Sequence, residues 1–216
     1  MLISVQELKY KFNINIKGIL HIGAHTCEEL SAYLNIGVNN NNIYWIKALP
    51  ELVEKNKINN PSLNIYQAVI SNKDNEMVTF HITKNDHTGD SQSSSILEFG
   101  SHTTSHPQVK MSEQRLMKTS RLETVIEKNN INMENVNFIN LDIQGVELRA
   151  LKSMEKYLHF IDYIYTEVNT EEVYKGCDQM NDITEYLKKF DFKLADAKIY
   201  KEFGWGDAIY IKNYKN

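Results

Sequence analysis

The residues most suited to chemistry stand at the ends of two segments that have the composition of buried strands. The first segment, residues 16–22, runs into Gly23 and Ala24. A helix with Glu28 and Glu29 in its first turn is expected to follow. Two small residues at a strand-to-helix turn let a ligand approach the backbone, and the free N–H groups of a helix start point toward it. One interpretation is a ligand-binding turn, and the other is a tight turn that holds no ligand.

The charge at this turn limits the ligand. Glu28 and Glu29 would repel a pyrophosphate, and the turn lacks the three glycines of a dinucleotide-binding fingerprint. S-adenosylmethionine carries a sulfonium and an α-ammonium group, whereas NAD and nucleoside triphosphates carry phosphates. The pattern therefore favours a methyl donor and disfavours a nicotinamide-dependent oxidoreductase.

The second segment, residues 136–142, ends with a carboxylate, Asp142. Gly145 allows a turn, and Glu147 begins the next helix. In a parallel sheet this position meets the ligand crevice, so Asp142 is the best candidate for an active-site carboxylate. The alternatives are structural: Asp142 caps the next turn, and Glu147 only stabilises a helix start.

Elements that position these residues alternate along the chain. Strands are expected at residues 16–22, 43–46, 65–70, 78–82, 136–142, 163–168, 192–195 and 208–211. Helices are expected at residues 28–34, from residue 50 onward, and at residues 122–127, 146–158 and 181–190. This alternation predicts an α/β fold with a mostly parallel sheet and helices on both faces. The last two strands have no helix between them and are expected to pair antiparallel.

One segment, at about residues 83–117, departs from this alternation. It is polar, lacks sustained periodicity, and contains His87, His102 and His106. It is either disordered or a substrate-side binding loop, and its few apolar residues favour a binding loop. The histidines lack a rigid ligand spacing, so no metal is expected.

The composition suits a single domain over residues 1–216. The 24 Lys and Arg against 28 Asp and Glu give a net charge of -4, which argues against a nucleic-acid partner. Cys27 and Cys177 are expected to be free thiols in a reducing compartment. No apolar stretch approaches the roughly 18 residues of a membrane span, so we expect a cytoplasmic protein without a membrane partner. Self-association is left open.

Six motifs, in order along the chain, resemble those of the FkbM-type S-adenosylmethionine-dependent O-methyltransferases. They are Gly23-Ala24-His25, Tyr44-Trp45-Ile46-Lys47-Ala48, Gln67-Ala68-Val69, Ser93-Ser94-Ser95-Ile96-Leu97, Leu141-Asp142-Ile143-Gln144-Gly145-Val146-Glu147 and Gly204-Trp205-Gly206-Asp207-Ala208. The resemblance implies a Rossmann-like class I methyltransferase fold, with a seven-stranded, mostly parallel sheet and a C-terminal antiparallel hairpin. It also implies S-adenosylmethionine as cofactor and a hydroxyl group as methyl acceptor, commonly on a sugar or a macrolide scaffold.

The resemblance also assigns positions to the cofactor. Residues implied to bind the donor are Ile22, Gly23, Ala24, His25, Lys47, Ala48, Ala68, Val69, Asp142 and Ile143. The family usually has an acidic residue where this chain has Lys47, and a lysine cannot accept hydrogen bonds from ribose hydroxyls. Either Glu51 substitutes, or Lys47 turns outward, or the cofactor differs and Lys47 meets a phosphate. Cys27 replaces a common glycine and is expected to pack against the sheet.

A sugar hydroxyl needs a base that removes its proton during methyl transfer. Asp142 is the first candidate for this base, followed by His25 and Glu167. His25 has the alternative of bonding only a neighbouring loop, and Glu167 that of a buried salt bridge.

Residues expected to bind the acceptor are Ser94, Ser95, Glu167 and Trp205. For Trp205 the alternative is a side chain that covers the core, and for the serines it is a flexible turn. The predicted function is methylation of a hydroxyl on a sugar, sugar nucleotide or glycan. The alternative is a catalytically degenerate sugar-binding or scaffold protein with the same fold.

Overall fold

A seven-stranded sheet forms the centre of the computed structural model, which describes residues 1–213. The strand order is β3-β2-β1-β7-β8-β10-β9. The strands are β1 (Ile19–Ile22), β2 (Ile43–Lys47), β3 (Asn64–Gln67), β7 (Phe138–Leu141), β8 (Tyr163–Asn169), β9 (Phe192–Tyr200) and β10 (Trp205–Lys212). Neighbouring strands are parallel except β10, which is antiparallel to β8 and β9. The prediction of a mostly parallel seven-stranded sheet with a closing antiparallel hairpin is confirmed.

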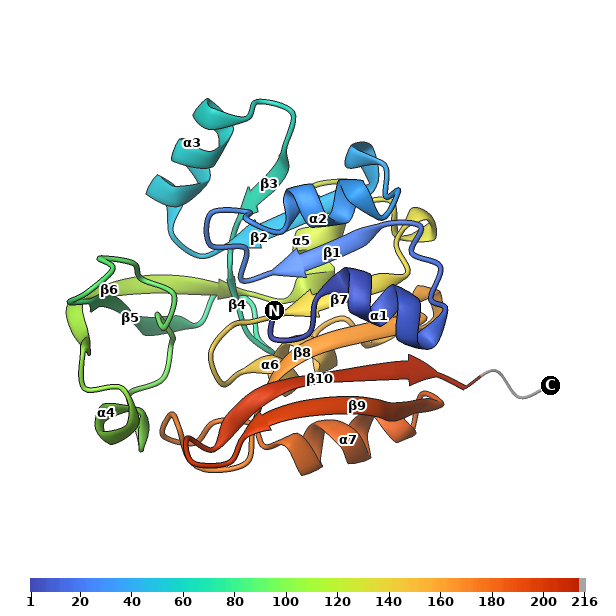
Figure 1. The fold of residues 1–216 in the computed structure, drawn as a ribbon. Coiled ribbons are helices and arrows are strands. Elements are labelled where there is room, and N and C mark those ends of the chain that lie inside the picture. The colour runs from blue at the N-terminus through green and yellow to red at the C-terminus, as the bar shows by residue number, and fades with distance from the viewer. Residues whose placement is uncertain (214–216) are drawn as a thin grey trace.

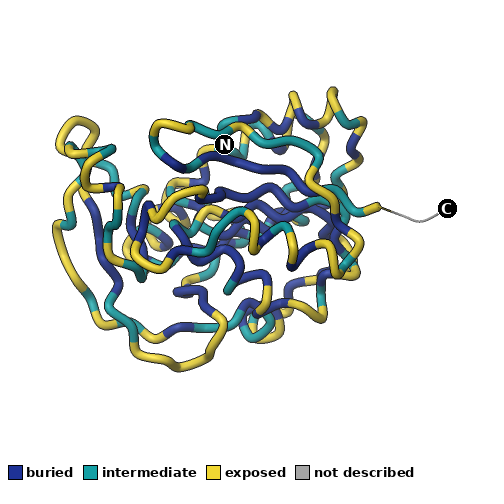
Figure 2. The backbone as a smooth tube through the Cα atoms, turned by 90° about the horizontal axis from the view of Figure 1, so that it is seen from below, coloured by how far each residue is buried: buried dark blue, intermediate teal, exposed yellow. Residues whose placement is uncertain are grey.

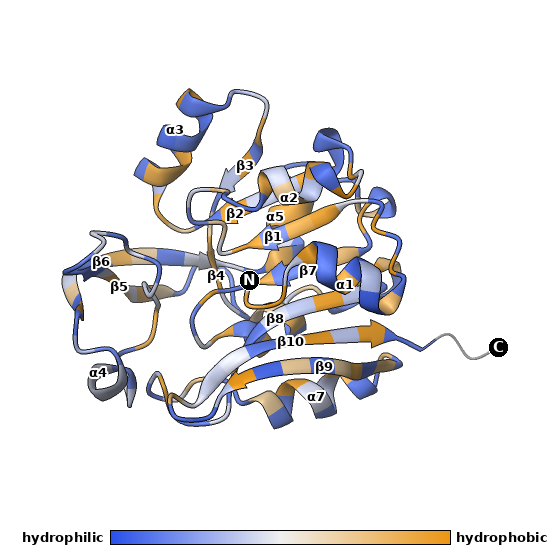
Figure 3. Ribbon diagram, in the orientation of Figure 1, coloured by the Kyte–Doolittle hydropathy of each residue, from blue (hydrophilic) through white to orange (hydrophobic). Residues whose placement is uncertain are grey.

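Helices cover both faces of this sheet, as predicted (Figure 1). The helices are α1 (Val5–Phe12), α2 (Leu30–Asn35), α3 (Pro50–Asn59), α5 (Leu122–Lys128), α6 (Glu147–Lys152) and α7 (Met180–Lys188). Side chains of α1, α2 and α3 form one core cluster with strand residues such as Trp45 and Phe138. Those of α5, α6 and α7 form the other with residues such as Ile139 and Leu141. Every residue of β1 and β7 is buried, and apart from His21 and Asn140 their side chains are apolar (Figures 2 and 3).

Several element boundaries differ from the sequence prediction. Helix α1 was not predicted; it is a short helix whose first turn is capped by the Ser4 side chain. Helix α2 begins two residues later than expected, because Glu28 and Glu29 still belong to the turn that follows His25 and Cys27, both of which have positive φ angles. The predicted helix 146–158 divides into α6 and the 3-10 helix η3 (Glu155–Phe160). Two further 3-10 helices are η1 (Asn40–Asn42) and η2 (Met133–Asn135).

A second, three-stranded sheet has the order β4-β6-β5. Its strands are β4 (Val69–Ile70), β5 (Met77–Asn85) and β6 (Val109–Ser120). Both ends of the polar segment 83–117 therefore belong to paired strands, and only residues 86–108, with the short helix α4 (His102–Ser105), lie between them. The sequence did not reveal β6 as a strand because most of its residues are exposed or half-buried and carry polar side chains, so no alternation of apolar and polar residues is apparent.

The small sheet lies on the side of the main sheet where the parallel strands end (Figure 1). It is therefore placed to form a wall next to the turns after β1 and β7. In residues 1–213 no helix has the length and apolar character needed to cross a membrane. The last three residues of the predicted domain 1–216 lie outside the described part of the chain.

Candidate active site

A first cavity lies at the carboxyl ends of β1, β2 and β7. It encloses about 860 Å³ of space, including solvent at its mouth. Its lining includes all ten residues that the sequence resemblance assigned to a donor: Ile22, Gly23, Ala24, His25, Lys47, Ala48, Ala68, Val69, Asp142 and Ile143. The structure thus brings these residues together, and their role in binding a cofactor stays a prediction.

The floor of this cavity is made by backbone packed directly on backbone. The N–H groups of Gly23 and Ala24 donate to the carbonyl of Ile46, at 3.0 and 3.2 Å. Gly23 has a φ of +97°, and a Cβ at this position would lie 1.7 Å from the carbonyl oxygen of Asp142. A glycine is therefore required at this turn both by its conformation and by the space available.

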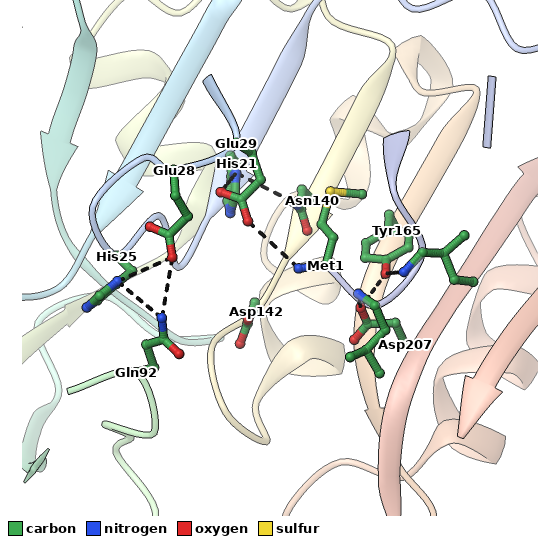
Figure 4. Close-up of polar contacts among 12 residues, drawn as sticks. Met1, His21, His25, Glu28, Glu29, Gln92, Asn140, Asp142, Tyr165 and Asp207 are labelled. Atoms are coloured by element: carbon green, nitrogen blue, oxygen red, sulfur yellow. Dashed lines mark hydrogen bonds and ion pairs between the residues drawn. The ribbon is translucent and has the colours of Figure 1, made fainter. Parts of the chain in front are cut away.

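His25 stands at the outer rim of the first cavity. Its Nδ1 lies 3.4 Å from Glu28 Oε1 and 3.4 Å from Gln92 Nε2, and its carbonyl accepts from the Asn56 side chain. Figure 4 shows this group on the opposite side of Asp142 from Asp207. His25 does not line the second cavity described below, so it shares a cavity with Asp142 but not with Glu167.

Cys27, in the same loop, is buried and has a φ of +58°. Burial raises the pKa of its thiol to about 12. The side chain packs in the core cluster on the α1–α3 face of the sheet, as the sequence predicted. Its left-handed conformation is one that glycine would adopt without strain.

Lys47 lines the first cavity and is 8% exposed, so it does not turn outward. Burial lowers the pKa of its ammonium group, and the negative charges of Asp142 and Glu28 oppose this shift. Within residues 1–213 its side chain has no hydrogen bond or ion pair. Glu51, the suggested substitute, pairs instead with Arg115 at 2.7 Å and is absent from the cavity lining.

A second cavity, of about 970 Å³ with its open solvent included, adjoins the first. Asp142 and Gln92 line both cavities, so the Asp142 carboxylate stands on a wall that the two share. Glu167 and Trp205, two of the predicted acceptor-binding residues, line the second cavity. The remaining walls come from the loop after β5, from α4 and from Tyr174.

Gln144 joins two of the candidate bases. Its side-chain NH2 group donates to Asp142 Oδ1 at 2.6 Å and to Glu167 Oε2 at 2.8 Å. The Tyr174 hydroxyl donates to Gln144 Oε1 and thereby fixes which way the amide points. Asp142 forms no ion pair within the described residues 1–213, and its side chain is exposed to the cavities.

Three buried carboxyl groups surround this bridge. Burial, together with the charge of Asp142, raises the pKa of Glu167 well above its usual range. Burial likewise raises the pKa of Asp207, which accepts a hydrogen bond from Tyr165. Glu147 is fully buried; burial raises its pKa to about 8, although it accepts from the N–H groups of Ile143 and Gly145.

The two serines predicted to bind the acceptor are engaged within the protein. Ser94 accepts from Thr83 N and donates to Ser91 O, and it lines the first cavity. Ser95 is 1% exposed and donates to the carbonyl of Gln144 at 2.7 Å. The structure places neither serine in the second cavity, and Ser95 instead supports the turn that carries Gln144.

Sequence reasoning missed several residues of the second cavity. Gln144 lies inside a quoted motif, and its position two residues after Asp142 was the available signal. His102 and His106 lie in the segment predicted to be a binding loop but were given no role of their own, and Tyr174 lies in an irregular segment between β8 and α7 that no sequence pattern marked. The His102 and His106 rings lie 4.9 Å apart, and residues 1–213 contain no group of three or more His, Cys, Asp or Glu side chains that could hold a metal.

The geometry is that of two adjoining compartments with one carboxylate between them. A carboxylate in this position can accept a proton from a group bound in the second compartment while a ligand occupies the first. The arrangement suits transfer of a group from one bound molecule to another.

The sequence profile of the "Methyltransferase FkbM domain" family matches residues 21–194. The structure of methyltransferase FkbM from Methylobacillus flagellatus has the same fold, with a TM-score of 0.54 and 12% identity. That similarity covers 90% of this chain but 43% of the other, so the chain spans less than half of that relative. No curated protein matches the sequence significantly.

Two further solved structures show weaker similarity. Magnesium protoporphyrin IX methyltransferase from Synechocystis, solved with bound S-adenosylmethionine, has a TM-score of 0.48 and 7% identity, covering 97% of this chain and 76% of that one. TrmK from M. capricolum, solved with S-adenosylhomocysteine, has a TM-score of 0.47 and 12% identity, covering 100% and 70%.

Proposed function

The chain belongs to the FkbM methyltransferase domain family, and from this premise we propose that it is an S-adenosylmethionine-dependent O-methyltransferase. The proposed acceptor is a hydroxyl group of a sugar, a sugar nucleotide or a glycan. The observation that supports this most strongly is the position of Asp142 on the wall between two cavities. One cavity is lined by the predicted donor-binding residues, and the other leaves room for a separate acceptor.

The first cavity suits S-adenosylmethionine in shape and charge. At Gly23 no side chain stands between a ligand and the backbone, and any side chain there would collide with Asp142. Glu28 and Glu29 supply negative charge for a ligand that carries a sulfonium and an ammonium group. When bound, S-adenosylmethionine supplies a methyl group activated by its positively charged sulfur.

The chain's own side chains orient the acceptor and remove its proton. In this proposal Asp142 accepts the proton of the acceptor hydroxyl as the new bond forms. Such general-base catalysis contributes typically ~10²–10⁴-fold to rate. Gln144 holds Asp142 in place, and Glu167 hydrogen-bonds the acceptor from the opposite side of the amide. His25 is the less favoured base because it lines only the first cavity.

We also propose which partner the protein acts on and in which compartment. The partner is a small molecule or glycan with a free hydroxyl, and neither nucleic acid nor a membrane takes part. We place the activity in the cytoplasm; the two free, buried cysteines suit a reducing compartment.

Calorimetric titration with S-adenosylmethionine and S-adenosylhomocysteine tests the proposal. We expect both to bind, whereas NAD, an adenosine-containing control that carries a pyrophosphate, gives no heat. Absence of binding by either donor compound at millimolar concentration would contradict the proposed function.

The buried Lys47 favours a second candidate, a sugar-binding or scaffold protein that has lost its donor site. Substitution Lys47→Glu discriminates, because it restores a group that accepts hydrogen bonds from ribose hydroxyls. A gain of about tenfold or more in donor affinity supports a degenerate site. Unchanged affinity means that the donor is held by other residues. The matched control is Lys55→Glu, on the exposed side of α3, where the same charge change leaves donor affinity unaltered.

A further inference from the structure

We propose that the second cavity binds a sugar without phosphate, so that the methyl acceptor is a glycoside or the end of a glycan and not a sugar nucleotide. The inference rests on the proposed function and narrows it. It depends on three observations in this cavity: the charge of its lining, its aromatic wall and its unpartnered histidines.

The charged side chains of the second cavity are all acidic. Asp90, Asp142, Glu167 and Asp207 line it, and no Lys or Arg is found among the lining residues in the described part of the chain. Diphosphates are bound in proteins by Arg, Lys, metal ions or the start of a long helix, and none of these faces the cavity. The cation among the lining residues described is the α-ammonium group of Met1, which lies 3.8 Å from Glu29 Oε1, so a diphosphate here would meet several carboxyl groups and a single positive charge that is already paired.

One wall of the cavity is aromatic. The half-buried Trp205 and the buried Tyr174 both line it. A pyranose ring has an apolar face of C–H groups and a rim of hydroxyls. An aromatic wall covers the apolar face, and carboxylates accept hydrogen bonds from the hydroxyls.

Two histidines in the cavity lack hydrogen-bond partners. His102 is 5% exposed and lines the cavity, and its Nδ1 has no partner; the same holds for Nδ1 of the neighbouring His106. Buried ring nitrogens are normally satisfied, since each unmade bond costs about 1–3 kcal/mol. Both Nδ1 atoms are shielded from the cavity in this conformation, so the rings would have to turn before a sugar hydroxyl, which both donates and accepts, could bond them.

The position of Asp142 on the wall shared by the two cavities allows methyl transfer to a sugar bound in this way. A sugar stacked on Trp205 lies in a cavity that Asp142 also lines, so one of its hydroxyls can be presented to the carboxylate. The phosphate of a sugar nucleotide would occupy the same acidic cavity, because the first cavity is reserved for the donor.

Binding to the protein saturated with S-adenosylhomocysteine tests the inference. The probes are the methyl glycosides of glucose, mannose and galactose, each paired with UDP-glucose, GDP-mannose or UDP-galactose. Calorimetry is expected to show binding of at least one glycoside, with the nucleotide form of that sugar binding at least ~10-fold more weakly. Equal or tighter binding of the nucleotide form, or no binding of any glycoside, overturns the inference.

Two pairs of variants connect the result to this cavity. Asp90→Lys adds a cation and should lower the ratio of glycoside affinity to sugar-nucleotide affinity by about tenfold. Asp86→Lys, in the same loop but outside the cavity, should leave this ratio unchanged. His102→Asn should weaken the glycoside by about tenfold, and the exposed His87→Asn should not. Retained S-adenosylhomocysteine binding confirms that each variant is folded. If neither Asp90→Lys nor His102→Asn changes the preference for the glycoside over the sugar nucleotide, the proposed site is contradicted.

Different results would contradict the proposed function and the inference about the acceptor. If S-adenosylhomocysteine does not bind the unmodified protein, the proposed function fails. If it binds and the sugar nucleotide is preferred, the methyltransferase proposal stands and only the inference about the acceptor fails.

Discussion

The two cavities adjoin but are built differently. The first is formed by short runs of residues at the ends of parallel strands, where backbone packs on backbone at Gly23 and Asp142. The second is assembled from segments far apart in the sequence: Met1 and Leu2, the loop after β5, α4, Tyr174 and the closing hairpin. A rigid site for a common cofactor beside a site made of variable segments lets one fold serve different acceptors.

Among the substitutions considered, Gly23→Ala should disrupt the first cavity most. The new Cβ would overlap the Asp142 carbonyl, so we expect donor binding to be abolished and the protein to be strongly destabilised. Urea unfolding and S-adenosylhomocysteine titration measure the two effects.

Gly37→Ala is the matched control. Gly37 has a φ of +93° but nothing within 4 Å of an added Cβ, so only the conformational cost, about 1–2 kcal/mol, applies. Donor affinity should not change. Equal effects of the two substitutions would mean that backbone packing at Gly23 is unimportant.

At the shared wall, Asp142→Asn should lower kcat by ~10²–10⁴-fold, because the amide cannot accept the proton. Donor affinity should fall much less. Asp86→Asn, a similar change on the surface, serves as control. A variant with unchanged kcat would show that Asp142 is not the base.

Within the second cavity, Tyr174→Phe removes the hydroxyl that orients Gln144. We expect about a tenfold loss in kcat/KM for the acceptor, with donor affinity unchanged, because only the second cavity loses a hydrogen bond. Tyr10→Phe, at a side chain that is 93% exposed, is the control. A loss of donor affinity instead would show that the two cavities are not independent.

The dependence of stability on pH concerns the buried Glu147 beneath the turn. Its pKa in the folded state is raised from 4.5 to about 8, so the folded state binds the proton more tightly than the unfolded state between these values. The free energy of unfolding should therefore fall as pH rises through this window, by at most ~1.4 kcal/mol per pH unit. Denaturation of Glu147→Gln at several pH values should show a flatter dependence, unlike the exposed control Glu54→Gln. An unchanged slope would contradict the assignment.

The sequence was sufficient for the main sheet and the lining of the first cavity. Residues such as Gly23, Ala68 and Asp142 lie at strand ends, and strand ends in a parallel sheet meet at one edge. Glu167 was located for the same reason, whereas Trp205 was located from its place between Gly204 and Gly206 in the closing hairpin.

The rest depended on contacts between distant segments. Ser95 looked suited to bind a ligand, but its hydroxyl bonds the carbonyl of Gln144, 49 positions away. His102 and Tyr174 meet through the packing of α4 against an irregular loop, for which no sequence period exists. Strand β6 was hidden because its side chains are polar on exposed surfaces.

The amide of Gln144 has a further consequence for the movement of protons. Both of its hydrogens are committed, one to each carboxyl group, and an amide nitrogen does not relay protons at neutral pH. Asp142 and Glu167 are therefore electrically coupled but insulated from proton exchange through this bridge. In the proposed mechanism, a proton taken up by Asp142 therefore leaves toward the open mouth of the cavities and not through Gln144.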